Sequence, residues 1–316
     1  MTTLSALLVV FSFVIAVGAG PVRPEAQPQE PPKPVMGIGG PYTHKILSAS
    51  SADGLNWTRD KGARLEHASV PCAVADGDRI LLYYVDADRG PGRPESIGCA
   101  VSSDGLQFEK QPFAIEGLPT HKAVDPSVLR GPDGKFRLYY FASGGPGDPA
   151  SAEGQHEIRL ATSDDGIRFR DAGPAFRHAR LVDPDVFHFK GLWFMYVFGG
   201  GDTVIATSAD GREFTYKQPL ALRGWGTVAP VLLADGRLRL YAFDQSKRGG
   251  NAVASFLSTD GINWTREAGV RLQAADDEQI TDPFVIRWKG LYKMYFKMEA
   301  RREDARSRPG RNRSRP

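Results

Sequence analysis

The chain has 316 residues, of which 41% are hydrophobic and 24% charged, values that are ordinary for a soluble globular protein. Its net charge of +3 comes from residues 301–316, where seven arginines face two acids, so the remainder is close to −2 (3 − 5). Because the positive charge is confined to the C-terminal tail, it does not indicate that the rest of the chain binds nucleic acid, and we expect no nucleic acid partner. A propeller or barrel of this length often forms one domain.

The N-terminal segment has the character of an export signal. Residues 4–17 are almost continuously apolar, shorter than the roughly 20 residues of a membrane span, and small residues follow. We expect a signal peptide over 1–19 and a secreted or periplasmic protein, although the missing Lys or Arg leaves an uncleaved anchor as the alternative. Residues 20–40 are proline-rich and predict an extended linker, 41–300 the folded domain, and 301–316 a basic disordered tail.

A phrase of the form Ser-x-Asp-Gly-x-x-aromatic occurs five times in the folded region. The copies are residues 51–57, 102–108, 163–169, 208–214 and 258–264. Their spacing is typical of repeat proteins, and an Asp-Gly turn before an aromatic residue indicates a β-hairpin. Acidic turns can bind metal, but a structural role is favoured: Asp caps the turn, Gly takes a positive φ, and the aromatic residue packs between repeats.

Each repeat is predicted to contain four antiparallel strands. The first strand follows a proline, at Pro71, Pro126, Pro184, Pro230 and Pro283. The second is rich in Leu and Tyr, the third is the small-residue run before the Ser-x-Asp-Gly turn, and the fourth starts at the aromatic residue. Four-stranded sheets repeated radially make an all-β propeller.

The order of the strands is permuted along the chain. It begins with a third and fourth strand, residues 45–59, and ends with a first and second strand, residues 281–297. Joining the two ends makes a complete fifth blade and leaves no open sheet edge. We therefore predict a five-bladed propeller whose last blade is closed by the N- and C-terminal segments.

Two cysteines fall within one predicted blade. Cys72 is on its first strand and Cys99 on its third. Two strand spacings are roughly 9.6 Å, beyond the roughly 7 Å Cα separation that a disulfide tolerates. We predict two buried free thiols, although an even pair in an exported chain would otherwise suggest a bridge.

Three of the five first strands begin with Asp-Pro, at Asp125, Asp183 and Asp282, whereas the other two have Val70 and Ala229. If these strands line the central channel, the carboxylates converge at one mouth, beside the longest loops. Like charges at close range raise a pKa and suit acid/base chemistry. The alternative is that Asp before Pro only satisfies backbone donors. Asp185 should project to the same side of its strand as Asp183.

Other residues near this mouth are candidates to complete the site. Glu157 is the best-placed acid, with Glu66 and Glu278 as alternatives, although surface glutamates are the commoner case. His67 and His121 suit ligand hydroxyls or are simple loop residues. Trp225 suits stacking on a sugar face or covers the core.

The five blades, the Asp-Pro strand starts, the Leu-Tyr-Tyr second strands and the Ser-x-Asp-Gly turns together resemble the five-bladed propeller glycoside hydrolases. These include family 43 arabinanases and xylosidases, invertases and levansucrases, and the resemblance spans residues 42–298. It implies an axial triad of Asp, Asp and Glu from successive blades. The chain departs from that triad at Val70 and at Ala229, where no glutamate follows. The turns also resemble sialidase Asp-boxes, but sialidases have six blades.

The sequence thus predicts an exported, monomeric, carbohydrate-active protein that hydrolyses glycosidic bonds of an oligo- or polysaccharide. Asp125 is expected as base, Asp183 as supporting carboxylate and Glu157 as acid, with His67, His121, Asp185, Trp225 and Asp282 in substrate binding. The alternative is a non-catalytic propeller that binds a glycan or a protein at the same face. No cofactor is required, although calcium held by the converging aspartates is a third hypothesis.

Overall fold

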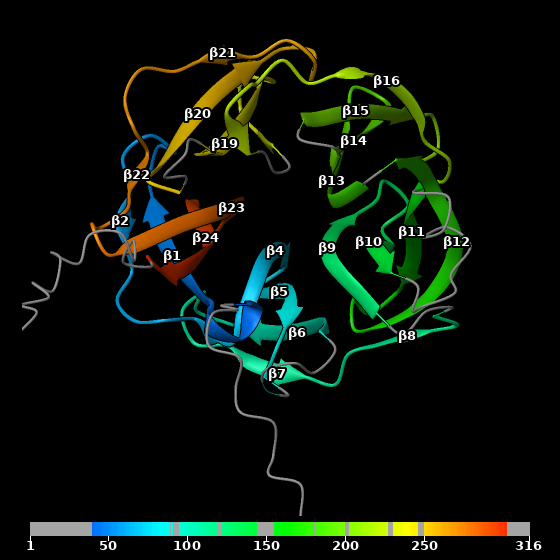
Figure 1. The fold of residues 1–316 in the computed structure, drawn as a ribbon, viewed down its shortest axis with the longest axis horizontal. Helices are drawn as coiled ribbons and strands as arrows, with labels where there is room; N and C mark the ends of the chain where they lie inside the picture. Colours follow the sequence, from blue (N-terminus) through cyan, green and yellow to red (C-terminus); the bar gives the residue numbers. More distant parts are fainter. Residues whose placement is uncertain are drawn as a thin grey trace, which may run out of the picture. The chain divides into compact units, whose positions relative to one another are not determined.

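The computed structural model describes residues 40–301 apart from 89, 91–94, 119–121, 144–154, 180, 200–201, 227–229 and 246–249. The described residues form five separate antiparallel sheets arranged in a ring, as Figure 1 shows along the ring axis. The predicted five-bladed all-β propeller is therefore confirmed. The predicted signal peptide, the linker except Gly40 and the tail except Arg301 lie outside the described residues.

The first three blades each follow one another along the chain. Blade 1 comprises β4 (Ala68–Asp76), β5 (Arg79–Asp86), β6 (Ser96–Ser102) and β7 (Glu109–Gln111). Blade 2 comprises β9 (Lys122–Arg130), β10 (Phe136–Ser143), β11 (Gln155–Ser163) and β12 (Arg168–Ala179), with β8 (Ala114–Glu116) added parallel to β12. Blade 3 comprises β13 (Leu181–Phe189), β14 (Leu192–Gly199), β15 (Asp202–Ser208) and β16 (Thr215–Pro219).

The last two blades contain shorter strand segments. Blade 4 comprises β17 (Trp225–Gly226), β18 (Val231–Leu232), β19 (Leu238–Asp244), β20 (Ala252–Ser258), β21 (Thr265–Arg266) and β22 (Leu272–Gln273). Blade 5 comprises β23 (Glu278–Trp288), β24 (Leu291–Ala300), β1 (Lys45–Ser51), β2 (Thr58–Arg59) and β3 (Leu65–Glu66), and a 3₁₀ turn, η1 (Pro41–Thr43), precedes β1.

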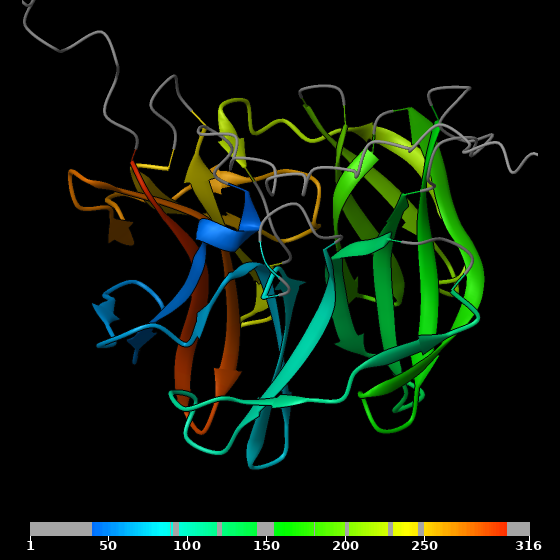
Figure 2. The same cartoon turned by 60° about the horizontal axis from the view of Figure 1, so that its bottom comes forward.

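Blade 5 is built from both ends of the folded region, as the permuted strand order predicts. β1 pairs antiparallel with β24 in an unbroken register from Lys45 opposite Met298 to Ser51 opposite Tyr292. Figure 2 shows the N-terminal strand β1, in blue, beside the C-terminal strand β24, in red. The ring is thus closed by seven consecutive residue pairs between the two terminal segments.

Five equivalent tyrosines join the blades. Each lies on the second strand of one blade, and its hydroxyl donates to the glycine carbonyl of the next blade's Asp-Gly turn. The bonds are Tyr83 to Gly166, Tyr139 to Gly211, Tyr196 to Gly261, Tyr241 to Gly54 and Tyr295 to Gly105, at 2.5–3.1 Å. The turn's aromatic residue meets the same tyrosine edge-to-face in every case, for example Trp57 against Tyr241 at 5.5 Å.

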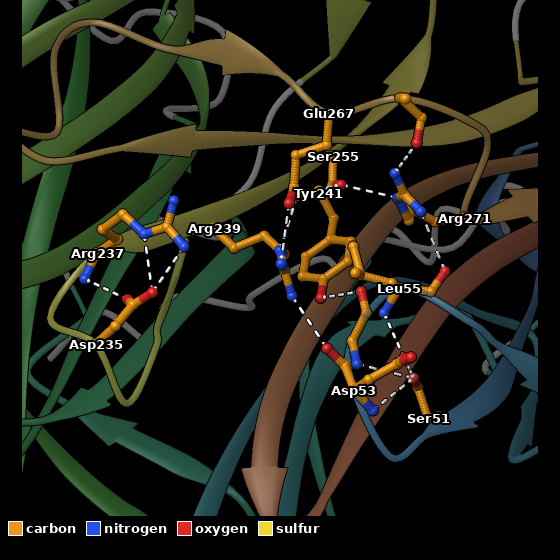
Figure 3. A network of polar contacts seen from close by, with 12 residues as sticks. Ser51, Asp53, Leu55, Asp235, Arg237, Arg239, Tyr241, Ser255, Glu267 and Arg271 are labelled. Atoms are coloured by element: carbon orange, nitrogen blue, oxygen red, sulfur yellow. Dashed lines mark hydrogen bonds and ion pairs between the residues drawn. The ribbon is translucent and has the colours of Figure 1, made fainter.

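The aspartates of these turns are structural, as predicted. Asp53 Oδ1 accepts the backbone N–H groups of Leu55 and Asn56, both at 2.8 Å, and Gly54 has a φ of 72°. Figure 3 shows this turn at the joint of blades 4 and 5, where Arg239 links it to Glu267 of blade 4. The five turns therefore use their side chains to hold the ring together.

The two cysteines are free and buried, as predicted. Cys72 on β4 and Cys99 on β6 are separated by Tyr83 of β5, which pairs with both. Burial raises the pKa of Cys99 to about 12 and that of Cys72 further, so both thiols stay protonated at neutral pH. In the described part of the chain no helix has the length and apolarity that a membrane crossing requires.

Candidate active site at the starts of the inner strands

In four of the five blades the described inner strand is irregular at the residue before its proline. The ladder between first and second strands shifts register there in blades 1, 2, 3 and 5. The residues concerned are Val70, Asp125, Asp183 and Asp282, all with φ between 45° and 55°. Such a bulge turns one side chain out of the sheet's alternation, and Asp tolerates the left-handed conformation better than most residues. The fifth position, Ala229, lies outside the described residues.

The three aspartates interact electrostatically. The pKa of Asp183 is raised well above its ordinary value, first by burial and then by the charges of Asp125 and Asp282. The charge of Asp185, a buried residue with 8% exposure, raises the pKa of Asp183 further, whereas the charge of Lys297 lowers it. The structure thus brings together the carboxylates that the Asp-Pro motif singled out.

Lys297 is the basic member of this group, and no sequence motif singled it out. Its Nζ lies 2.8 Å from Oδ2 of Asp282, which also accepts the Thr281 hydroxyl at 3.0 Å. Burial alone would lower the pKa of Lys297, but the carboxylates of Asp282, Asp183 and Glu299 hold it above its ordinary value. A signal was available in the repeats, because the four equivalent positions are apolar: Val85, Phe141, Phe198 and Phe243.

A second polar pair extends from Lys297 toward blade 1. His44, only 8% exposed, places Nε2 3.0 Å from Glu299 Oε2 and Nδ1 3.1 Å from the hydroxyl oxygen of Ser69. Ser69 directly precedes Val70, the one described bulge residue that is not an aspartate. The joint between blades 5 and 1 is therefore polar at this end, although its bulge residue is apolar.

Glu157 is engaged elsewhere. It lies on β11, the third strand, and its carboxylate contacts Arg159 and Arg177, the latter at 2.8 Å. It pairs with Ala142, which pairs with Ala123 on the inner strand, so it is roughly 9.6 Å outward of that strand. Glu157 is thus at the expected end of blade 2, but two strands away from the row of aspartates.

The remaining candidates are held by local partners. Glu66 pairs with Lys45 at 3.0 Å, and Glu278 pairs with Arg59 at 2.7 Å. His67 stacks on Tyr42 with ring centroids 4.1 Å apart and bonds to its carbonyl through Nδ1. Trp225 contacts Phe256 edge-to-face at 5.6 Å, and Arg266 lies 5.0 Å over its ring. His121 lies outside the described residues.

The carboxylates at this end do not form a metal cluster in the described ranges. No group of three or more His, Cys, Asp or Glu side chains there is arranged to hold an ion. The ammonium of Lys297 supplies a positive charge to Asp282 at this end. The raised pKa of Asp183 favours a carboxyl group that holds a proton beside the ion pair of Asp282 and Lys297, and such a group suits acid/base catalysis.

No protein-family model matches the sequence, and no curated protein is detectably similar to it. Solved structures are similar. An α-L-arabinofuranosidase from Clostridium thermocellum is 19% identical, with 71% of this chain and 80% of that chain covered and a TM-score of 0.54. A thermostable family-43 glycoside hydrolase is 14% identical, with 77% and 95% covered and a TM-score of 0.56. An exo-β-1,3-galactanase from Phanerochaete chrysosporium is 14% identical, with 78% and 64% covered and a TM-score of 0.53.

These similarities establish a shared fold. The chain has the five-bladed propeller that the family-43 structures and a family-117 glycoside hydrolase from Zobellia galactanivorans also have. The fold expected from the resemblance in the sequence is thereby confirmed. A shared fold does not by itself assign an activity, which has to be argued from the site.

Proposed function

We propose that this protein is an exported glycoside hydrolase that acts on an oligo- or polysaccharide where the inner strands begin. The observation that carries the proposal is the group formed by Asp125, Asp183 and Asp282 on the inner strands of blades 2, 3 and 5, together with Lys297 on β24. Hydrolysis of a glycosidic bond needs one carboxyl group that holds a proton and one that is ionised. The shared fold with glycoside hydrolases supports the same conclusion.

Within this proposal Asp125 is the base, Asp183 is the supporting carboxylate and Glu157 is the acid. Burial and neighbouring negative charges favour the protonated form of Asp183. Asp282 is neutralised by Lys297 and serves to position the others and the substrate. Glu157 stays the acid predicted from the sequence, and reaching a bond near Asp125 would require it to leave Arg159 and Arg177.

The experiment that tests the proposal is product release from a panel of plant and microbial polysaccharides and aryl glycosides. Asp125→Asn and Asp183→Asn should each lower kcat at least 100-fold. Asp235→Asn is the matched control, because Asp235 pairs with Arg237 beside the turn between β18 and β19. Full activity in both Asp125→Asn and Asp183→Asn would contradict the roles assigned to these two aspartates. A further variant, Glu157→Gln, shows whether the Glu157 side chain supplies the proton.

Export is tested separately by expression of the full chain in a bacterium that secretes through the general pathway. We expect the protein outside the cytoplasm with a mass that corresponds to cleavage after Ala19. A protein that keeps its first residues and sediments with membranes would instead be anchored.

A non-catalytic glycan-binding propeller is the second candidate function. It is favoured by Val70, which replaces an aspartate at one bulge, and by the distance of Glu157 from the other carboxylates. It predicts saturable binding of a glycan without product release. Calorimetry with the polysaccharides of the same panel distinguishes this function from hydrolysis.

A further inference from the structure

A cavity of about 590 Å³ lies between the second halves of the five inner strands. Its walls come from β4, β9, β13, β18 and β23, and it extends to Gly131 and Pro132 in the turn after β9. The first wall residue of β9, Val128, is three residues beyond Asp125, or roughly 10 Å along the strand. On β13 the first wall residue, Val186, directly follows Asp185, so the cavity begins next to the aspartate site and extends toward the other end of the inner strands, but no aspartate lines it.

A ring of equivalent positions shapes this cavity. In each blade, one exposed residue of the inner strand lines the cavity. Its partner on the second strand lies three residues before the tyrosine that joins that blade to the next. These residues are Ala75, Arg130, His188, Leu232 and Arg287. Leu232 is 54% exposed, which is unusual for a large aliphatic side chain, and it gives the ring an apolar position in blade 4, next to the blade of Arg287.

Three of the five positions carry Arg or His, namely Arg130 of blade 2, His188 of blade 3 and Arg287 of blade 5. The cavity walls include Arg130, His188 and Arg287 but no Asp or Glu. Arg130 is bound to Asp76 and stacks on Phe136 at 4.3 Å, so it is held in place. Arg287 lies 5.3 Å over the ring of Tyr292, and within the described residues it has no acidic partner. An oriented guanidinium at an apolar cavity is suited to a planar anion.

We propose that this cavity binds a small organic anion that carries a carboxylate on an apolar ring or chain. The carboxylate would contact Arg287, while the apolar body would pack on Leu232 and Val231. The volume is in the range of small-molecule sites, which are mostly apolar with a few polar groups that fix the orientation. Anions would be repelled at the opposite end of the inner strands, where Asp125, Asp183 and Asp282 gather.

The test measures binding of 4-fluorobenzoate to the full chain by ¹⁹F NMR and calorimetry. Neutral 4-fluorobenzamide is the matched probe. We expect saturable binding of the benzoate and roughly tenfold weaker binding of the amide. Arg287→Ala should weaken the benzoate roughly tenfold and leave the amide unchanged. Leu232→Asn should weaken both probes.

Two control variants locate the site. Arg237→Ala removes an exposed arginine that pairs with Asp235 and does not line the cavity, and Asp125→Asn alters only the aspartate site. Both should bind 4-fluorobenzoate as the unaltered chain does. Equal affinity for the two probes, unchanged affinity in Arg287→Ala, or no saturation by protein that still unfolds cooperatively would each overturn the proposal. The outcome does not depend on whether the aspartates catalyse hydrolysis.

Discussion

At the scale of single residues, Asp183 links the chemistry of the site to the stability of the fold. Its pKa is raised in the native state, chiefly by burial and by Asp125, so the native state keeps a proton that the unfolded chain loses at about pH 3.9. Stability contributed by this group is complete below that pH and is lost as pH rises through the raised native pKa. At neutral to alkaline pH, Asp183 therefore destabilises the fold.

We predict that Asp183→Asn raises Tm by about 3 °C at pH 8, and that the gain disappears toward pH 4. Thermal unfolding followed by circular dichroism across this range measures it. Asp235→Asn is the control of opposite sign, because Arg237 holds the pKa of Asp235 below its ordinary value. A gain that is the same at pH 4 and pH 8 would contradict a pH-dependent origin.

Lys297 should stabilise the site as long as its partner is present. Lys297→Met leaves Asp282 and Asp183 without their cation, and breaking a pair at this depth costs about 3 kcal/mol. The double variant Lys297→Met/Asp282→Asn should recover most of that loss, because the charge left behind is then removed. Urea unfolding of the single and double variants gives the coupling energy, which we expect to exceed 1 kcal/mol.

Val70 is strained in a way that its aspartate counterparts are not. It is β-branched and has a φ of 45°, which costs about 1–3 kcal/mol. Val70→Asn should therefore increase the free energy of unfolding by about 1 kcal/mol, since Asn adopts this conformation readily. Val270→Asn, at an exposed position without a positive φ, should change it little. Loss of stability in Val70→Asn would show that packing of the valine side chain stabilises the fold by more than the backbone strain destabilises it.

The residues of the site were only partly predictable. The Asp-Pro motif identified Asp125, Asp183 and Asp282 because all three occupy one repeated position. Lys297 was missed because it stands out only when the second strands of all five blades are superimposed. Glu157 was placed at the right end of its blade, and its distance from the inner strand was predictable, because the two strand spacings that separate Cys99 from Cys72 also separate a third-strand residue from the first strand.

At the scale of elements, the joints between blades depend on the tyrosines of the second strands. Tyr241→Phe removes the hydrogen bond to Gly54 and leaves that carbonyl buried without this donor. We expect a loss of about 1–2 kcal/mol in the free energy of unfolding. Tyr216→Phe is the matched control, because Tyr216 is 45% exposed on β16 and stacks on His178 of blade 2, but its hydroxyl is not one of the five that donate to an Asp-Gly turn. Equal changes in the free energy of unfolding for Tyr241→Phe and Tyr216→Phe would show that the hydrogen bond at the joint does not contribute specifically to stability.

Most of the strands were predictable, whereas their additions were not. The period of the Ser-x-Asp-Gly turns and the prolines before the inner strands located nearly every blade strand. β8 was not foreseen, because it joins β12 in parallel and brings together residues 114 and 168 without a local turn. Such pairing depends on the tertiary path between blades 1 and 2, which hydrophobic periodicity does not report.

At the scale of the whole molecule, the ring requires both terminal segments. A chain lacking residues 1–60 has lost β1 and β2 and with them the acceptor of Tyr241. We predict that it fails to unfold cooperatively, because the edge of β24 and one joint are left open. A chain lacking residues 1–39 keeps every described strand and should match the full chain in Tm. Cooperative unfolding of the chain that lacks residues 1–60, at the Tm of the full chain, would show that four complete blades suffice.

The register of β1 against β24 also sets how the ring responds to mechanical load. Lys45 lies opposite Met298, so the chain enters and leaves the folded region at the same end of one antiparallel pair. A force that pulls the two ends apart therefore loads these backbone bonds one after another, as in a zipper, and does not shear them together. Tension on the termini would open the ring at this seam, while the joints made by Tyr83 and Tyr139, distant in sequence, carry none of the initial load.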